Sequence, residues 1–459
     1  MAGIGFELRR VLKKNSLFSI AKVYGYSAFL SSGPWVISIL AIIVVGFINI
    51  ATVGVDGADG SVVSYQIVIT YAIALASSMV ITGVIQLPFT RYIADKIYAE
   101  KEDEVLPAYY GVLLVMWIVS FPIVLPLLFF VFPDESDFFI LGTMSTFLVL
   151  SGVWISNILA ASLKYYHAVI FAYAFAYGLI IILSYYFGQT IESLILIFFT
   201  GNAILLIILM LLITKSYEST RLISFGFFSK NFYWRLGVAG LLYNMGAWVD
   251  KVIFWYHPLT GYAAIGKLNA SVVYDLPIFL AYLSILPGMA IFFFRLEADF
   301  ADKYDLFFDA VRNGGTLANI RRYQNEMTEI VRHAIKEIIV IQGIMNLMLF
   351  IMAESIFEML NIPQLYLGLF YILTVGAQLQ LGFMSIMAIL YYLDRQHIAM
   401  WLTILFFTLN GVLTLLSIYM GPSMFGYGYA IALLITFTFS LIVVRHELKE
   451  LDYETFMLH

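Results

Sequence analysis

The stretch IESLILIFFTGNAILLIILMLLIT, residues 191–214, decides the fold class of this chain. It contains one ionisable side chain, Glu192, and is long enough to cross the ~30 Å hydrocarbon core of a bilayer as one helix. No water is present there to satisfy backbone N–H and C=O groups, so only helices and closed barrels span a membrane. Barrel strands alternate apolar and polar residues, which this stretch does not. It therefore predicts a transmembrane helix.

Apolar runs of similar length recur along the whole chain, and we count twelve. In the first half they lie at about 20–50, 62–88, 105–131, 138–161, 166–187 and 191–214. In the second half they lie at about 234–256, 268–294, 330–352, 365–391, 399–419 and 425–444. Of the 459 residues 62% are apolar and 12% are charged, whereas a soluble protein is about 25% charged. We predict an all-α membrane protein of about twelve transmembrane helices.

The distribution of basic residues predicts the orientation of these helices. Lys215 follows the run at 191–214, and Glu192 stands at its opposite end. If all twelve runs span, 23 of the 25 Lys and Arg residues fall on the side of Lys215, while the opposite loops are acidic. Cytoplasmic loops carry the excess of Lys and Arg. Both termini are therefore predicted to be cytoplasmic.

Short matches between the two halves predict an internal repeat. Gly33-Pro34-Trp35-Val36 in the first run matches Gly246-Ala247-Trp248-Val249 in the seventh, and the second run of each half ends on an arginine, Arg91 or Arg295. Both halves begin inside, so the repeat is parallel, as in transporters that alternate access around a central site. We expect two six-helix bundles around a central cavity: residues 1–214, with an amphipathic N-terminal segment, and residues 234–459. A cytoplasmic linker at 215–233 joins them, and the second bundle carries a cytoplasmic loop at 296–329.

Ionisable residues inside the spans are the first candidates for mechanism, because each costs about 2.5–3.5 kcal/mol at the centre of a membrane helix. Asp250 and Lys251 lie in the seventh run, and Asp275 lies in the eighth. We expect them to line a translocation cavity that binds polar substrate or a coupling proton. The alternative is a static salt bridge. Adjacent helical residues point about 100° apart, which argues against a shared partner for Asp250 and Lys251.

Two further pairs have candidate roles. Arg91 and Arg295 could close a cytoplasmic gate by pairing with Asp95 or Asp299; the alternative is a headgroup anchor. Gly33 and Pro34 interrupt the first run and could form a hinge; the alternative is close helix packing.

Neutral amide side chains and one amphipathic segment complete the candidates. The amides within the runs could bind hydroxyl-rich cargo or bridge helices: Gln66, Asn157, Gln342, Asn346, Gln378, Gln380 and Asn410. Residues 302–311 read as an amphipathic helix that ends at Gly314 and Gly315, with Thr316 capping the next helix. That helix could lie on headgroups or dock a cytoplasmic enzyme.

Missing motifs argue against an enzyme. Gly266-Lys267 is followed by Leu268, so it forms no phosphate-binding loop, and His446-Glu447 lacks the second histidine of a zinc protease. The chain has no cysteine and thus no thiolate metal site. We expect no catalytic residues, metal, cofactor or nucleic-acid partner.

Three segments resemble one family. The opening MAGIGFELRR (1–10), SGPW (32–35) and YYLDR (391–395) are similar to PelG proteins, and the resemblance extends over the whole chain. PelG-like proteins are assigned to the multidrug/oligosaccharidyl-lipid/polysaccharide flippase superfamily, whose members have two six-helix bundles around a central cavity. Asp250-Lys251 resembles the acidic-basic step in the seventh span of polysaccharide flippases.

The resemblance implies export of Pel, an N-acetylhexosamine-rich biofilm exopolysaccharide, across the bacterial inner membrane. It also implies a complex with the glycosyltransferase PelF, which would feed the polymer, and with the membrane proteins PelD and PelE. Three alternatives stay open: a flippase for lipid-linked oligosaccharide, a cation-coupled antiporter for small molecules, and a non-transporting scaffold for the glycosyltransferase.

Overall fold

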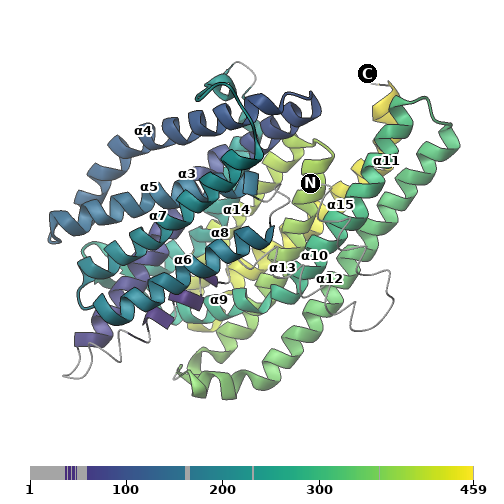
Figure 1. Ribbon diagram of the computed structural model, residues 1–459. Helices are drawn as coiled ribbons and strands as arrows, with labels where there is room; N and C mark the ends of the chain where they lie inside the picture. The colour runs from purple at the N-terminus through teal and green to yellow at the C-terminus, as the bar shows by residue number, and fades with distance from the viewer. Residues whose placement is uncertain are drawn as a thin grey trace. The chain divides into compact units, whose positions relative to one another are not determined.

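The computed structural model describes residues 59–160, 166–229, 232–360 and 362–457, together with part of 37–48. Helices dominate this part of the chain (Figure 1). The chain divides into two compact units. We call them the N-unit, the described residues up to Trp248 with Phe254–Ser271, and the C-unit, Val249–Ile253 with the described residues from Val272 on. Whether the halves divide at 214 and 234 stays a prediction.

The N-unit contains five long helices and most of a sixth. They are α3 (Asp59–Tyr98), α4 (Val105–Val131), α5 (Asp137–Ala160), α6 (Tyr166–Phe187), α7 (Ile191–Ser216) and α8 (Trp234–Tyr256). The run that opened the sequence analysis is α7, which Thr190 caps through its side chain and the backbone N–H of Ser193. Helices α3 and α6 both pack on the α5–α7 pair.

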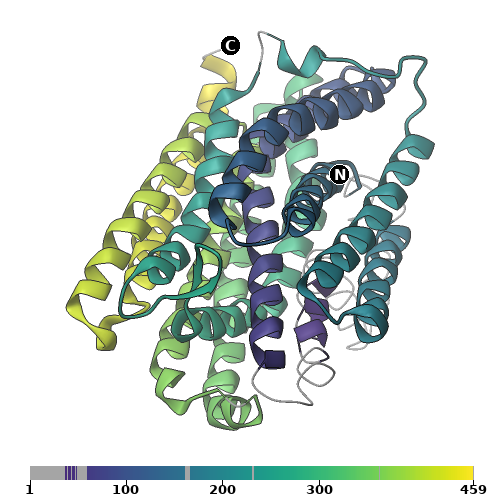
Figure 2. The same cartoon turned by 90° about the vertical axis from the view of Figure 1, so that its left-hand side faces the viewer.

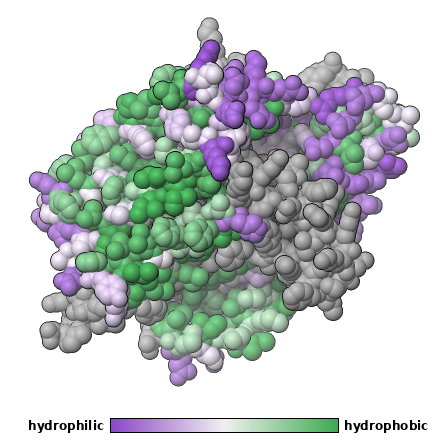
Figure 3. All heavy atoms as spheres, in the orientation of Figure 1, coloured by the Kyte–Doolittle hydropathy of each residue, from purple (hydrophilic) through white to green (hydrophobic). Residues whose placement is uncertain are grey.

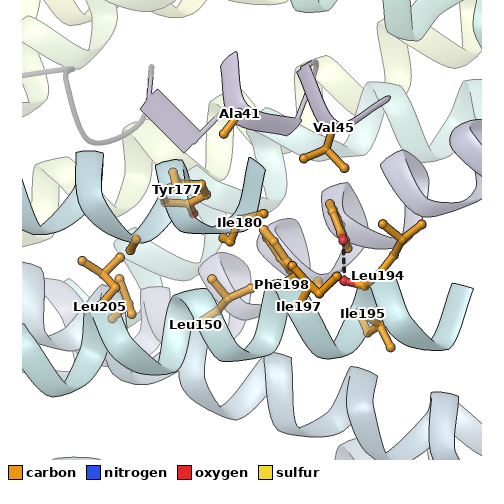
Figure 4. Close-up of a cluster of buried hydrophobic side chains, with 14 of the residues drawn as sticks. Ala41, Val45, Leu150, Tyr177, Ile180, Leu194, Ile195, Ile197, Phe198 and Leu205 are labelled. Atoms are coloured by element: carbon orange, nitrogen blue, oxygen red, sulfur yellow. Dashed lines mark hydrogen bonds between the residues drawn. The ribbon is translucent and has the colours of Figure 1, made fainter. Parts of the chain in front are cut away.

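The core of the N-unit is apolar and aromatic. Phe198 and Leu205 on α7 and Tyr177 and Ile180 on α6 are buried in one cluster (Figure 4). The Tyr71 ring stacks on Phe198 at 3.9 Å, and its hydroxyl donates to the backbone oxygen of Leu194. Aromatic packing in α3, α6 and α7 therefore joins helices that are distant in sequence.

A short hairpin follows α8 within the N-unit. Strands β1 (Tyr262–Ile265) and β2 (Leu268–Ala270) pair antiparallel around Gly266, whose φ is +54°. The hairpin lies on the helices: Gln66 on α3 donates to the Ala264 oxygen, and the Lys267 backbone N–H donates to the Val131 oxygen at the end of α4. Residues 268–270 were expected to open the eighth span. They form a strand instead, because their backbone pairs with β1.

The C-unit contains the remaining helices. They are α9 (Val272–Ser284), α10 (Leu286–Phe294), α11 (Ala301–Arg312), α12 (Leu317–Met359), α13 (Leu367–Tyr392), α14 (Gln396–Met420) and α15 (Tyr427–Met457), with a π-helical turn, η4 (Arg295–Phe300), between α10 and α11. Helix α15 packs along both α13 and α14; Figure 2 shows α14 and α15 side by side in yellow-green and yellow.

A polar helical extension continues from the C-unit. Helix α12 has 43 residues and is about 64 Å long, roughly twice the bilayer core. Its start pairs with α11 through Lys303 and Glu326 at 2.8 Å and with α15 through Gln324, which donates to the Leu448 oxygen. Hydrophilic atoms gather over α11 (Figure 3). The predicted amphipathic helix, the turn at Gly314 and the Thr316 cap are all confirmed.

Among the described residues, nine helices are long and apolar enough to cross a membrane, or ten when α9 and α10 count as one bent span. Helix α8 does not reach that hydropathy because it contains Arg235, Asp250 and Lys251. The first run, 20–50, lies mostly outside the described residues. That these two segments also span, which the count of twelve requires, stays a prediction.

Candidate functional site

Two adjacent charges are buried near the end of α8. The exposed fraction is 0% for Asp250 and 5% for Lys251. The Lys251 ammonium lies 3.2 Å from each carboxylate oxygen of Asp250. A buried charge is tolerated only when it is paired and hydrogen-bonded. The structure therefore places a compact ion pair inside α8, in the part of that helix that belongs to the C-unit.

Helix α9 supplies two hydroxyl partners. The Tyr274 hydroxyl donates to Asp250 Oδ2 at 2.6 Å, and the Lys251 ammonium donates to the Tyr282 hydroxyl at 3.1 Å. The ammonium also lies 5.0 Å from the centre of the Tyr282 ring and 5.7 Å from that of Tyr429 on α15. Both distances are within the range of cation–π attraction. The lysine is thus held by a carboxylate and two aromatic rings.

Helix α14 completes the shell around the carboxylate. The Asn410 amide lies 3.4 Å from Asp250 Oδ1, and its own oxygen accepts from Thr414 at 3.1 Å. The Tyr429 hydroxyl donates to Gln380 on α13. Groups from α8, α9 and α14 therefore converge on Asp250. We call Asp250, Lys251, Tyr274, Tyr282, Asn410 and Tyr429 the buried charge cluster.

The predicted site residues are brought together only in part. Asp250 and Lys251 share a site, and they pair with each other because the lysine side chain is long enough to bend back to its neighbour. The 100° step argued only against a shared third partner, and the hydroxyl groups that they bind, Tyr274 and Tyr282, are different. Asp275 lies in the first turn of α9 and is half-buried, but the residue that bonds Asp250 is Tyr274. A cavity role for Asp250, Lys251 and Asp275 stays a prediction.

Sequence reasoning missed the tyrosines. Asn410 was among the amides considered, but Tyr274, Tyr282 and Tyr429 were not. The chain has 31 tyrosines, and membrane proteins place many at the interface. Only the folded positions of α9 and α15 distinguish these three from the rest.

Arg295 lies at the end of α10 and forms the expected pair with Asp299, at 2.5 Å. It also binds Glu337 on α12 through two hydrogen bonds, of 2.6 and 2.8 Å. The bonds to Glu337, and then the bond to Asp299, raise the pKa of Arg295. This arginine connects the C-terminal end of α10 to α12. A gate role stays a prediction.

Arg91 lies near the end of α3 and pairs with Asp95 at 3.2 Å. Asp95 also accepts from the hydroxyl of Tyr233, the residue before α8. Burial, and then the bond to Asp95, raise the pKa of Tyr233, so the phenol stays protonated and donates at neutral pH. The predicted pair of Arg91 and Asp95 therefore exists, and its contacts extend to the start of α8.

Glycines let the backbones of α3 and α8 come into direct contact beyond the Arg91–Asp95–Tyr233 contacts. A Cβ on Gly240 would stand 2.2 Å from the Gly83 oxygen, and a Cβ on Gly237 would stand 2.9 Å from the Val84 oxygen. Asn244 adds a hydrogen bond of 2.9 Å to the Met79 oxygen. Small residues at such crossings allow the closest helix packing in membranes.

Gly33 and Pro34, the predicted hinge, lie outside the described residues. Within the residues that are described, no three His, Cys, Asp or Glu side chains are grouped as a metal site would require.

The fold is similar to that of the MOP-superfamily transporters. The chain is similar to a MATE family multidrug resistance transporter of that superfamily, solved in an outward-facing conformation (TM-score 0.63, 14% identity, 93% of this chain and 96% of that chain covered). It is also similar to a MOP superfamily transporter from Pyrococcus furiosus (0.63, 13%, 93% and 96%) and to MATE in the bent conformation (0.63, 12%, 98% and 98%). The MATE-like transporters have twelve helices in two bundles, which confirms the predicted fold class.

The chain belongs to the PelG family, described as "Putative exopolysaccharide Exporter (EPS-E)", whose model matches residues 1–456. The family resemblance noted in the sequence is thereby confirmed. A comparison with curated proteins finds no match. Family and fold together make this chain a multi-pass membrane transporter of an exopolysaccharide exporter family.

Proposed function

We propose that this chain exports Pel, an N-acetylhexosamine-rich exopolysaccharide, across the bacterial inner membrane during biofilm matrix synthesis. The observation that carries the proposal is the family match over residues 1–456 on a transporter fold. In this proposal the cytoplasmic glycosyltransferase PelF feeds the polymer, PelD and PelE complete the membrane complex, and both termini are cytoplasmic. The polar extension of α11, α12 and α15 gives the chain a large surface outside the bilayer core, consistent with that arrangement.

The buried charge cluster is the proposed moving part of the transporter. Asp250 and Lys251 satisfy each other in the described conformation, so neither needs a ligand there. Opening the pair would expose a carboxylate and an ammonium together with three tyrosines and an amide. Such groups donate and accept hydrogen bonds, and tyrosine rings can pack against sugar faces. The cluster is therefore suited to contact a hydroxyl- and amide-rich polymer in another conformation.

A cation-coupled antiporter is less favoured by the same geometry. An inorganic cation bound at Asp250 would have to approach at least one of its carboxylate oxygens. The Lys251 ammonium already lies 3.2 Å from each of them, so the chain supplies its own cation. The remaining competitor is a flippase for lipid-linked oligosaccharide, which would use the same fold.

The test compares cells that lack this chain with cells that express it, in a strain that synthesises the polymer. Polymer outside the cells is measured by binding of a lectin specific for N-acetylhexosamine, and polymer inside by the same lectin after lysis. The proposal predicts that deletion moves polymer from outside to inside. Normal external polymer without the chain would refute it. Polymer extracted into organic solvent on a lipid carrier would favour the flippase.

A further inference from the structure

The eighth span is broken in the middle of the C-unit. Helix α9 ends at Ser284, α10 begins at Leu286, and the two axes differ by 40°. Pro287 in the first turn of α10 has no N–H and cannot continue the hydrogen bonds of α9. A break at membrane depth leaves carbonyl groups that lipid cannot satisfy. The molecule must therefore provide a donor.

Gln342 on α12 is that donor. Its side chain is fully buried, and its amide nitrogen donates to the Ser284 oxygen at 2.8 Å and to the Asn346 side-chain oxygen at 2.8 Å. The side chain of α12 thus supplies a donor to the Ser284 carbonyl, the last of α9, at the break.

The orientation of this amide is fixed by a row of bonds. Gln378 on α13 donates to the Ile339 backbone oxygen at 3.0 Å, so its own oxygen is left to accept from Asn346 at 2.8 Å. Asn346 in turn must accept from Gln342. A flip of any one amide would place donor against donor or acceptor against acceptor. The row holds the Gln342 nitrogen on Ser284.

The start of α10 is packed against the same amide. A Cβ on Gly288 would stand 2.3 Å from Leu381 Cδ2 on α13 and 3.0 Å from Gln342 Oε1. Gln342 Oε1 is buried and has no hydrogen-bond partner within the described residues. Only glycine fits there, so the break is shaped from both sides by α12 and α13.

The break separates two clusters of charge. Helix α9 carries Tyr274 and Tyr282, which hold the buried charge cluster, whereas α10 ends at Arg295, which is bound to Glu337 on α12. Glu337 and Gln342 lie on the same helix, little more than one turn apart. Helix α12 therefore holds α10 through Glu337 and binds the break, which we call the hinge, through Gln342. Helix α9 is attached instead to Asp250 and Lys251.

We propose that Gln342 is a positioning residue for transport: it sets the bend of the broken eighth span, through which opening of the buried charge cluster is converted into movement of α9 relative to α12. The role in transport rests on the proposed function, whereas the geometry of the break does not. When Asp250 and Lys251 separate, α9 is released at Tyr274 and Tyr282 and turns about Ser284, while Arg295 keeps α10 in place.

The test measures the α9–α12 distance in the full-length chain in nanodiscs. The chain contains no cysteine, so Leu276→Cys on α9 and Arg332→Cys on α12, both exposed, give one clean pair of spin labels on opposite sides of the break. Gln342→Met removes the donor at similar length. Asn202→Leu is the matched control, because Asn202 is a fully buried amide of the N-unit, away from the break: it donates to the Phe198 oxygen and accepts from the Tyr177 hydroxyl on α6.

We expect Gln342→Met to shift or broaden the distance distribution and Asn202→Leu to leave it as in the wild type. Gln342→Glu, which is neutral when buried in the membrane and then keeps one of the two donated bonds, should shift the distance less than Gln342→Met. A wild-type distribution in Gln342→Met would overturn the proposal. If that variant does not accumulate, Gly288→Ala decides, because its Cβ must displace Leu381 or Gln342; an unchanged distribution there would also overturn the proposal.

The export assay adds an independent readout. We expect Gln342→Met to lose about 5-fold in external polymer, the effect of about 1 kcal/mol of lost hydrogen bonding, with equal amounts of chain in the membrane. If the wild-type chain exported nothing, the proposed function would fail while the distance measurement still tested the hinge. Unchanged export together with an altered distance would contradict the positioning role.

Discussion

Neutralising one partner of the buried Asp250–Lys251 pair should lower the free energy of unfolding far more than neutralising one partner of an exposed pair. In Asp250→Asn the ammonium of Lys251, with an exposed fraction of 5%, loses the carboxylate that lies 3.2 Å away. Breaking a buried pair by removing one partner costs about 3–5 kcal/mol. The matched control is Glu104→Gln, which breaks the pair with Lys96. Those side chains are 38% and 23% exposed, so that change should cost under about 1 kcal/mol.

A double variant separates the pair from its surroundings. Asp250→Leu combined with Lys251→Met removes both charges and retains apolar volume. Such replacements of buried pairs are often neutral or stabilising by about 1–4 kcal/mol. We therefore expect the double variant to be markedly more stable than Asp250→Asn, with a coupling energy of about 2 kcal/mol or more.

Denaturant titration of the purified chain in detergent provides the assay, with the unfolding midpoint compared among variants that show the same slope. Equal midpoints for Asp250→Asn and Glu104→Gln would refute the reasoning about burial. The single variants Asp250→Leu and Lys251→Met complete the cycle, and a double variant as unstable as the sum of their two effects would refute the pairing.

The same double variant distinguishes the two interpretations of the cluster. If Asp250 and Lys251 form only a static salt bridge that stabilises the helix packing, a stable double variant should export polymer normally. If they take part in translocation, export should fall although the protein accumulates in the membrane. We expect the second result.

Two further variants test contacts around the site. Gly240→Ala places a Cβ 2.2 Å from the Gly83 oxygen and should destabilise the α3–α8 crossing by about 1–3 kcal/mol, whereas Gly368→Ala, with nothing within 4 Å, should not; equal unfolding midpoints would contradict the crossing. Tyr274→Phe removes the 2.6 Å bond to Asp250 and should cost about 1.5–3 kcal/mol, because that bond is made to a charged group; a midpoint within error of the wild type would show that the hydroxyl does not support the carboxylate.

The helices could be predicted from the sequence because the bilayer constrains the backbone so strongly. The stretch at 191–214 became α7 and the run at 105–131 became α4 with matching ends. Long-range pairing was not predictable in the same way. The strand at 268–270 forms only because residues 262–265 lie beside it, and its own sequence, Leu-Asn-Ala, carries no strand signal.

The break in the eighth span could have been predicted from the local sequence. Pro287 and Gly288 follow Leu286 in the middle of an apolar run, and proline is the usual cause of a sharp bend in a helix. Its partner, Gln342, was singled out as an amide within a span but without a role. The contact between Gln342 and Ser284 joins residues 58 positions apart, and only the packing of α12 on the break reveals it.

In the candidate site too, local sequence predicted some features, and others depend on contacts between distant helices. Asp250 and Lys251 could be found because ionisable groups within spans are rare and costly. Their pairing with each other could not be chosen over a cavity role, because the sequence does not show which way the long lysine side chain bends. The tyrosines that surround them belong to a residue type too common in this chain to carry a signal.

Translocation of polymer in membrane vesicles tests the central claim most directly. Inverted inner-membrane vesicles that contain the polymer-synthesising glycosyltransferase, with or without this chain, are supplied with the sugar-nucleotide donor. A glycoside hydrolase is then added outside. The account predicts polymer that is protected within the vesicle lumen only when the chain is present, with Asp250→Leu/Lys251→Met vesicles losing most of that protection. Equal protection in vesicles that lack the chain would contradict it.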